Sequence, residues 1–379
     1  MPNFKAPTLS KQKTSFETSF SSLKDPRRTI KGNYLYPLQE ILLLTISAVL
    51  SGFKDWTTIQ TFGENKLDWL RQFYPYKEGI PSHDVLGKLF KRLDPDMFSQ
   101  CFTDWINQVS ELTEGEVVAI DGKSICGSAD SSRPKSAVHI VSAYASDNRV
   151  CLGQKAVDEK SNEITAIPKL LELLTIKGCV VTIDAMGCQA DISKNVINSG
   201  ADYVLAVKGN QKELFEQVKK MFSIHKSANT HESVDVGHGR VETRICQAID
   251  DLTFMDDTAS WTKLQSVVRV QSERYFKKTG KTTKDIRYYI SSLTANAKRL
   301  NEIVRQHWAV ENNLHWSLDV IFKEDSSLKK KDYSAVNFNI INKVALAILE
   351  KDTSVKLSKP RKMAKAALND EYRSKLLKG

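Results

Sequence analysis

The sequence lacks the features that mark membrane-spanning and secreted proteins. Its longest apolar run, from Ile41 to Leu50, is interrupted by Thr45 and Ser47. It has about half the length of a membrane-spanning helix, which needs roughly 20 residues. The first residues do not follow the charged, apolar and small-residue order of a signal peptide. We therefore expect a cytoplasmic protein with no membrane partner.

Cysteine is scarce, and its spacing points to no metal site or disulfide framework. None of the 6 cysteines forms a C-x-x-C pair, and no histidine is spaced beside them as in a zinc finger. In a reducing compartment such thiols are expected to be small buried apolar residues. Internal repeats and low-complexity tracts are also absent.

Positive charge and apolar residues are both plentiful. The chain has 379 residues, which suggests two or three domains, and 41% of them are hydrophobic, enough for a sizeable core. Its 55 Lys and Arg outnumber its 45 Asp and Glu, for a formal charge of +10. This charge favours an anionic partner such as DNA, although net charge bears on association and not on fold.

Composition and periodicity divide the chain into six segments. They are a basic arm over 1–33, a helical domain over 34–112, a mixed α/β segment over 113–230, a β-rich segment over 231–293, a helical segment over 294–350 and a basic, partly disordered tail over 351–379. The segment 294–350 should hold a long helix from Ala295 to Phe322, capped by Thr294, and a last helix from Tyr333 to Leu349. Strands alternating with helices predict a mixed sheet with helices packed on it.

Two predicted strands end in an aspartate. Val117 to Asp121 and Val180 to Asp184 each run four strand-forming residues into the acid. If both strands belong to one sheet, the two carboxylates meet at its edge and can share a hard cation such as Mg²⁺. The alternative is that each Asp simply starts a turn, and the pair leaves the two interpretations close to even.

A third carboxylate lies in a helical segment between two histidines. Helical spacing puts His307, Glu311 and His315 on one face. Burying a Glu is costly unless its charge is compensated. The face fits either a His-Glu-His metal site or a hydrogen-bonded core cluster, and the cluster is favoured from the residues alone. Trp308 and Trp316 could stack on a flipped base, but their spacing favours the core.

Six short phrases carry a resemblance to a known family. They are IPSHD at 80–84, IDGK at 120–123, TIDAMGCQ at 182–189, VKGNQ at 207–211, HGRVETR at 238–244 and HWAVEN at 307–312. Each phrase alone is weak, but six in this order are specific and run through nearly the whole chain. The sequence resembles the DDE transposases of bacterial insertion sequences, and among them the H-repeat-associated group.

The resemblance implies an RNase H-like core. Asp121 would lie on its first strand, Asp184 on its fourth strand and Glu311 on the late helix, and all three would be catalytic residues and metal ligands. The resemblance makes 231–293 a β-rich insertion between the two parts of this core. The preceding helical domain would bind the DNA ends.

The same resemblance implies the cofactor and the partners. Two Mg²⁺ ions per site are expected, for which Mn²⁺ should substitute. The partners would be double-stranded DNA, as terminal inverted repeats and as target, and a second copy in a homodimer on DNA. The protein would then be associated with the nucleoid when it is bound to DNA. Candidate phosphate contacts are Lys123, Lys208, Arg240, Arg244, Arg305 and His307, each weighed against a solvated surface charge.

Several positions depart from the family pattern. Val304, His307 and Leu318 stand where Tyr, Arg and Lys are expected, and Cys126 stands where Arg is expected. A catalytically silent DNA-binding relic is therefore one alternative. A metal-dependent phosphohydrolase is another, disfavoured because Gly122 and Lys123 follow the first Asp in place of a second carboxylate.

Overall fold

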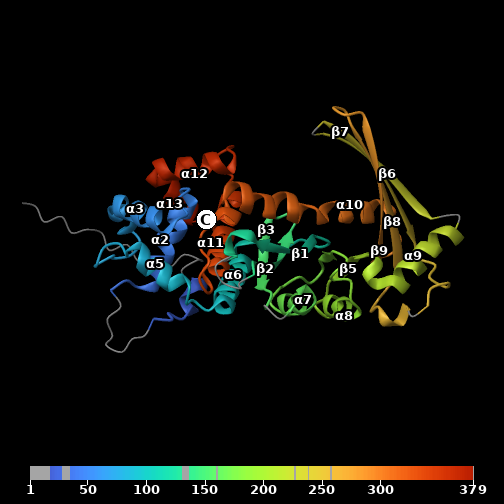
Figure 1. Ribbon diagram of the computed structural model, residues 1–379, viewed down its shortest axis with the longest axis horizontal. Helices are drawn as coiled ribbons and strands as arrows, with labels where there is room; N and C mark the ends of the chain where they lie inside the picture. Colours follow the sequence, from blue (N-terminus) through green and yellow to red (C-terminus); the bar gives the residue numbers. More distant parts are fainter. Residues whose placement is uncertain are drawn as a thin grey trace, which may run out of the picture.

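The computed structural model describes residues 18–27, 35–129, 136–158, 161–225, 228–237, 239–256 and 258–378. Figure 1 shows helices gathered at one end, a sheet in the middle and a group of long strands at the other end. The predicted basic arm over 1–33 falls mostly outside the described residues, as does His238.

The helical end begins with the predicted helical pattern, which is confirmed. Its elements are η1 (Phe20–Ser22), α2 (Leu38–Leu50), α3 (Trp56–Asn65), α4 (Leu67–Leu70), α5 (His83–Phe90) and α6 (Pro95–Val109). Ser82 caps α5 as expected, because its Oγ accepts a hydrogen bond from Val85 N at 3.4 Å. Helix α2 is buried along nearly its whole length, so other helices must cover it on several sides.

The C-terminal helices provide that cover. They are α11 (Ser334–Lys351), α12 (Lys359–Leu368) and α13 (Asp370–Lys378), and all three contact α2. The prediction of a partly disordered tail is wrong for the described residues, because the tail buries Met363, Ala366, Tyr372 and Leu376 at helical spacing. Arg373 is fully buried, with its guanidinium 3.9 Å from the centre of the Trp69 ring.

The sheet contains nine strands in the order β3-β2-β1-β4-β5-β9-β8-β7-β6. The first five are β1 (Val117–Ile125), β2 (Val138–Ala145), β3 (Val150–Ala156), β4 (Val180–Ile183) and β5 (Asp202–Val207). β1, β2 and β3 are antiparallel, whereas β4 and β5 run parallel to β1. Two helices connect the later strands, α7 (Glu163–Leu171) before β4 and α8 (Ala190–Asn198) before β5. The predicted mixed α/β fold with an RNase H-like core is confirmed.

Four further strands extend the sheet beyond β5. They are β6 (Asn229–Gly237), β7 (Arg240–Ile249), β8 (Ser266–Phe276) and β9 (Lys281–Ser291), all antiparallel to their neighbours. β9 pairs antiparallel with β5 from Val204↔Ser291 to Val207↔Tyr288. The β-rich segment therefore continues the same sheet. Helix α9 (Lys212–Ile224) packs its Phe215 and Phe222 rings against Tyr288.

A helical rod crosses the sheet and returns the chain to the helical end (Figure 1). It consists of α10 (Ala297–His307) followed by two π-helical segments, η5 (Val310–His315) and η6 (Ser317–Ile321). The predicted cap Thr294 is wrong. The cap is Asn296, whose Oδ1 accepts a hydrogen bond from Arg299 N at 3.0 Å.

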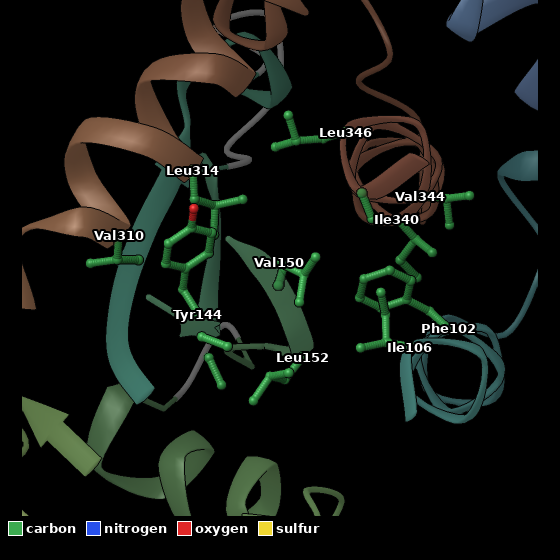
Figure 2. Close-up of a cluster of buried hydrophobic side chains, with 14 of the residues drawn as sticks. Phe102, Ile106, Tyr144, Val150, Leu152, Val310, Leu314, Ile340, Val344 and Leu346 are labelled. Carbon is green, nitrogen blue, oxygen red and sulfur yellow. The ribbon is translucent and has the colours of Figure 1, made fainter. Parts of the chain in front are cut away.

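The core lies between the sheet and the helices. In Figure 2, Tyr144 of β2 lies beside Leu314 of the rod, and Val150 of β3 lies between this pair and Ile340 of α11. Among the cysteines, Cys126 is exposed, contrary to expectation, and the other five are buried. Trp316 is 52% exposed, so its predicted core position is also wrong.

Candidate active site

Asp121 lies where one ladder of β1 stops and the other continues. Pairing with parallel β4 ends at Ile120↔Ile183, whereas pairing with antiparallel β2 runs on through Asp121↔Ser142 to Ile125. The expectation that Asp121 ends its strand is therefore wrong, because β2 is long enough to hold β1 for four more residues. Toward β4, however, Asp121 stands at an open edge.

Asp184 is the first residue after β4, next to that edge. Adjacent strands lie about 4.8 Å apart, so the two backbones bring both carboxylates to one place. Asp184 Oδ1 accepts hydrogen bonds from Met186 N at 3.0 Å and Gly187 N at 3.3 Å, which fixes the turn. A side chain at Gly187 would place its Cβ 2.3 Å from Ile183 Cγ2, so only glycine fits there.

A second phrase of the sequence braces this turn. Asn210 Nδ2 donates to Ala185 O at 2.6 Å, and Gln211 Nε2 donates to Cys188 O at 3.0 Å. The VKGNQ phrase was singled out in the sequence, but it gave no sign of this role for Asn210 and Gln211. The loop that carries Asp184 is therefore held from both sides.

The rod brings Glu311 and His315 to the same edge. Glu311 lies in η5 and is exposed, while Val310 and Leu314 of the same segment are buried against the sheet. His315 Nδ1 is 3.5 Å from Asp121 Oδ2. Burial, together with the charge of Lys343, lowers the pKa of His315 to about 3, so the ring is neutral at pH 7. π-helical turns occur often at functional sites.

His307 points elsewhere. Its Nδ1 is 2.9 Å from Thr182 Oγ1 on β4, and burial, with the charge of Arg287, lowers its pKa to about 4. No group of three or more His, Cys, Asp and Glu side chains in the described part of the chain is close enough to hold a metal as the side chains stand. The two histidines and Glu311 therefore do not form a His-Glu-His metal site in this arrangement.

The carboxylates influence one another electrostatically. Burial, followed by the charges of Asp184 and Glu311, raises the pKa of Asp121 from 3.8 to about 7. Glu163 at the start of α7 contributes to the same effect, and its Oε1 is 2.6 Å from His139 Nε2. Gathered carboxylate oxygens are the ligands that Mg²⁺ prefers. The donor atoms of Asp121, Asp184 and Glu311 suit a divalent cation in their chemistry, although the three side chains do not stand close enough together to hold one as they lie.

The structure separates the predicted DNA contacts into groups. Lys208 is exposed before η3 (Gly209–Gln211), and Lys123 is held among carboxylates beside Asp121. Arg240, Arg244 and Arg305 line one hollow between β6, β7 and the rod, together with Trp308.

Acidic partners neutralise part of this arginine group. Arg244 Nε is 2.9 Å and Arg274 Nε 3.1 Å from Glu242 Oε1, while Arg305 pairs with Asp235. Burial raises the pKa of Glu242, but the two arginines outweigh it and lower the pKa overall.

Within the described residues, no helix is long and apolar enough to cross a membrane.

An RNase H-like sheet of this strand order, with Asp121 and Asp184 next to the edge where the β1–β4 ladder ends, agrees with the class of DDE transposase domains. The chain belongs to the DDE transposase family: residues 112–348 match the family described as "Transposase DDE domain", and residues 17–106 match the one described as "DDE_Tnp_1-associated".

Curated relatives agree with this assignment and with the predicted H-repeat-associated group. The chain is 39% identical over 370 residues to the "H repeat-associated putative transposase YhhI" of Escherichia coli strain K12, covering 95% of this chain and 96% of that protein. It is 41% identical over 224 residues to "H repeat-associated putative transposase YbfD" of the same strain, 57% of this chain and 88% of that protein. A shorter match, 46% over 55 residues, is to "Inactive transposase YbfQ", 14% of this chain and 66% of that protein.

Proposed function

We propose that the protein is an active transposase that cuts DNA at the ends of its insertion sequence and joins the 3′-OH ends to target DNA. The observation that carries this proposal is the meeting of Asp121 and Asp184 where the β1–β4 ladder ends, within range of the charge of Glu311. Family membership supports DNA as the substrate and divalent metal as the cofactor.

The three acids serve as cation ligands in the proposed reaction. When bound, two divalent cations neutralise charge at phosphorus and activate the attacking oxygen. Asp121, Asp184 and Glu311 would hold the cations, since the charges of Asp184 and Glu311 both act on Asp121. Because the pKa of Asp121 is raised to about 7, its carboxyl would have to give up a proton to hold a cation at neutral pH.

DNA is assigned to the face of the rod and to the helical end. The hollow with Arg240, Arg244 and Arg305 suits the phosphate backbone. The helical segment 34–112 is assigned to read the terminal repeats, because sequence recognition needs base contacts that a nuclease core rarely provides. The segments 113–230 and 294–350 are assigned to the catalytic core, and the segment 231–293 is assigned to its insertion. Two copies of the protein are assigned to one pair of DNA ends.

The test uses purified protein and linear DNA that carries the repeats flanking its gene, with Mg²⁺ or Mn²⁺. Wild type is compared with Asp184→Asn and with Asp191→Asn, an exposed acid on α8 that serves as the control. Products are resolved on a strand-separating gel, and end binding is measured by mobility shift.

Wild type and Asp191→Asn should nick the repeat ends in a metal-dependent way, and Asp184→Asn should bind without cutting. Substantial cleavage by Asp184→Asn would remove the second carboxylate from the site. A shifted but uncut band in all three proteins would favour the DNA-binding relic. Hydrolysis of small phosphate esters without DNA would favour the phosphohydrolase.

A further inference from the structure

Lys123 lies on the same face of β1 as Asp121, because alternate side chains of a strand point the same way. Its side chain is only 14% exposed. The ammonium is surrounded by acids from the end of the rod and the turn that follows it, η7 (Glu324–Ser326). A lysine so placed is poorly available to a DNA phosphate.

Three carboxylates contact this ammonium. Lys123 Nζ is 2.6 Å from Asp319 Oδ1, 3.3 Å from Glu324 Oε2 and 3.5 Å from Asp325 Oδ1. Asp319 belongs to η6, which directly continues the segment that carries Glu311. The lysine therefore joins the strand of the first carboxylate to the helix of the third.

The acids are themselves held in place. Glu324 is 4% exposed, and its Oε1 accepts hydrogen bonds from Asn339 Nδ2 at 2.7 Å and Asn342 Nδ2 at 3.3 Å, both on α11. Asp325 Oδ1 accepts from Cys126 N at 3.0 Å. Even without the contacts of Lys123, Glu324 is therefore fixed to α11 and Asp325 to the residue that follows β1.

The backbones on either side of the junction are also in close contact. A Cβ at Gly127 would lie 2.6 Å from the carbonyl oxygens of both Asp325 and Ser327, so the turn after β1, η2 (Cys126–Ser128), approaches the segment around η7 as closely as only glycine permits. Without the ammonium, three negative side chains would face one another at this contact. Repulsion among them would move η6 and η7 away from β1.

We propose that Lys123 is a positioning residue that sets Glu311 against Asp121 by binding Asp319, Glu324 and Asp325. The inference rests on the proposed function for the roles of Asp121 and Glu311, but the contact itself does not. It replaces the phosphate contact predicted for Lys123 from the sequence.

The test compares Lys123→Met, Lys123→Arg and Lys208→Met, the last removing an exposed lysine outside the junction. Asp319→Asn removes the other partner of the Lys123–Asp319 ion pair, and it takes the place of Lys123→Met in the test if that variant does not fold. Four quantities are measured: amide hydrogen exchange of residues 310–327 without DNA, end affinity against salt, the cleavage rate of fully bound DNA, and the Mn²⁺ concentration for half-maximal rate.

In Lys123→Met, exchange over 310–327 should quicken by about tenfold, which corresponds to losing one charge-assisted hydrogen bond. The cleavage rate should fall by about tenfold, less than the hundredfold expected for a rigidly held group displaced by about 1 Å, because the exposed Glu311 side chain can follow part of the shift. The Mn²⁺ requirement should rise, while the salt dependence of binding stays unchanged. Lys123→Arg should recover most of the rate, because a guanidinium can also bind carboxylates.

Two results would overturn the proposal. One is unchanged hydrogen exchange in both Lys123→Met and Asp319→Asn, since the exchange needs no cleavage and so tests the junction even if the protein is inactive. The other is a change in the salt dependence of DNA binding. If the slope of log affinity against log salt concentration is smaller by about one in Lys123→Met, the variant has lost a phosphate contact. Lys208→Met should give that second pattern if Lys208 touches DNA.

Discussion

The two aspartates and the glutamate of the candidate site stand on different kinds of backbone. Asp121 and Asp184 lie on paired strands and a braced turn, where ladders and hydrogen bonds fix each position. Glu311 lies on a π-helical segment with its own side chain exposed. One half of the site is set by the sheet and the other half is adjustable.

This difference suggests how a site for cations can be built without collapsing when it is empty. Three carboxylates held rigidly together would repel one another strongly. Glu311 is exposed to solvent, whereas Asp121 is half-buried, and burial, followed by the charges of Asp184 and Glu311, raises the pKa of Asp121. The comparison predicts that the aspartates on the sheet and the glutamate on the rod tolerate a change in side-chain length differently.

The largest difference should come from exchanging carboxylate lengths. Asp184→Glu moves a carboxylate that the turn cannot release, so the cleavage rate should fall by about a hundredfold or more. Glu311→Asp shortens a side chain on the adjustable half, and the loss should be only about tenfold. Single-turnover cleavage on bound DNA measures both. Equal losses would show that the two halves are equally rigid.

A smaller effect is expected on stability in Asp121→Asn. An acid whose folded pKa, about 7, lies above its unfolded value of 3.8 makes the folded protein lose stability as pH rises between these values. Asparagine removes this loss, so the metal-free variant should be more stable than wild type by about 2 kcal/mol at pH 8, after allowance for screening. The difference should vanish near pH 4. Denaturant unfolding in EDTA at both pH values measures it, and a variant that is less stable at pH 8 would contradict the argument.

The smallest effect should follow from loosening the fixed half in Asn210→Ala. Losing the bond from Asn210 Nδ2 to Ala185 O should destabilise the protein by about 1 kcal/mol. The turn that carries Asp184 would then be held less rigidly, as Glu311 is. The Mn²⁺ concentration for half-maximal cleavage rate should rise several-fold. Asn198→Ala at the end of α8 is the control, and a metal titration of the cleavage rate distinguishes the two.

Much of the sheet could be predicted because strand-forming runs and turns depend on residues that are close together in the sequence. The β-branched runs ending in Asp121 and Asp184 marked both strands and the meeting of the two acids. The extension of β1 to Ile125 could not be seen, since Gly122, Lys123 and Ser124 are poor strand formers. Pairing with β2 decided it.

The predictions that were wrong elsewhere share a physical cause. Residues far away in the sequence decide whether a given side chain is buried and which groups it contacts. The tail looked too basic to order, yet Arg373 is covered by the Trp69 ring from the other end of the sequence. Lys123 was a candidate phosphate contact, weighed against a solvated surface charge, and nothing in its own segment showed that Asp319 would lie beside it. Trp316 looked buried by spacing, but the π-helical turns rotate it outward.

The packing of α11, α12 and α13 on α2 has a consequence for the timing of synthesis. Residues 38–50 leave the ribosome early, but the helices that cover them begin at residue 334. At about 5–20 residues per second, α2 waits on the order of 15–60 s with its apolar sides uncovered. A chain cut short before residue 334 therefore lacks the three helices that cover α2, so it should be cleaved by proteases faster than the full chain.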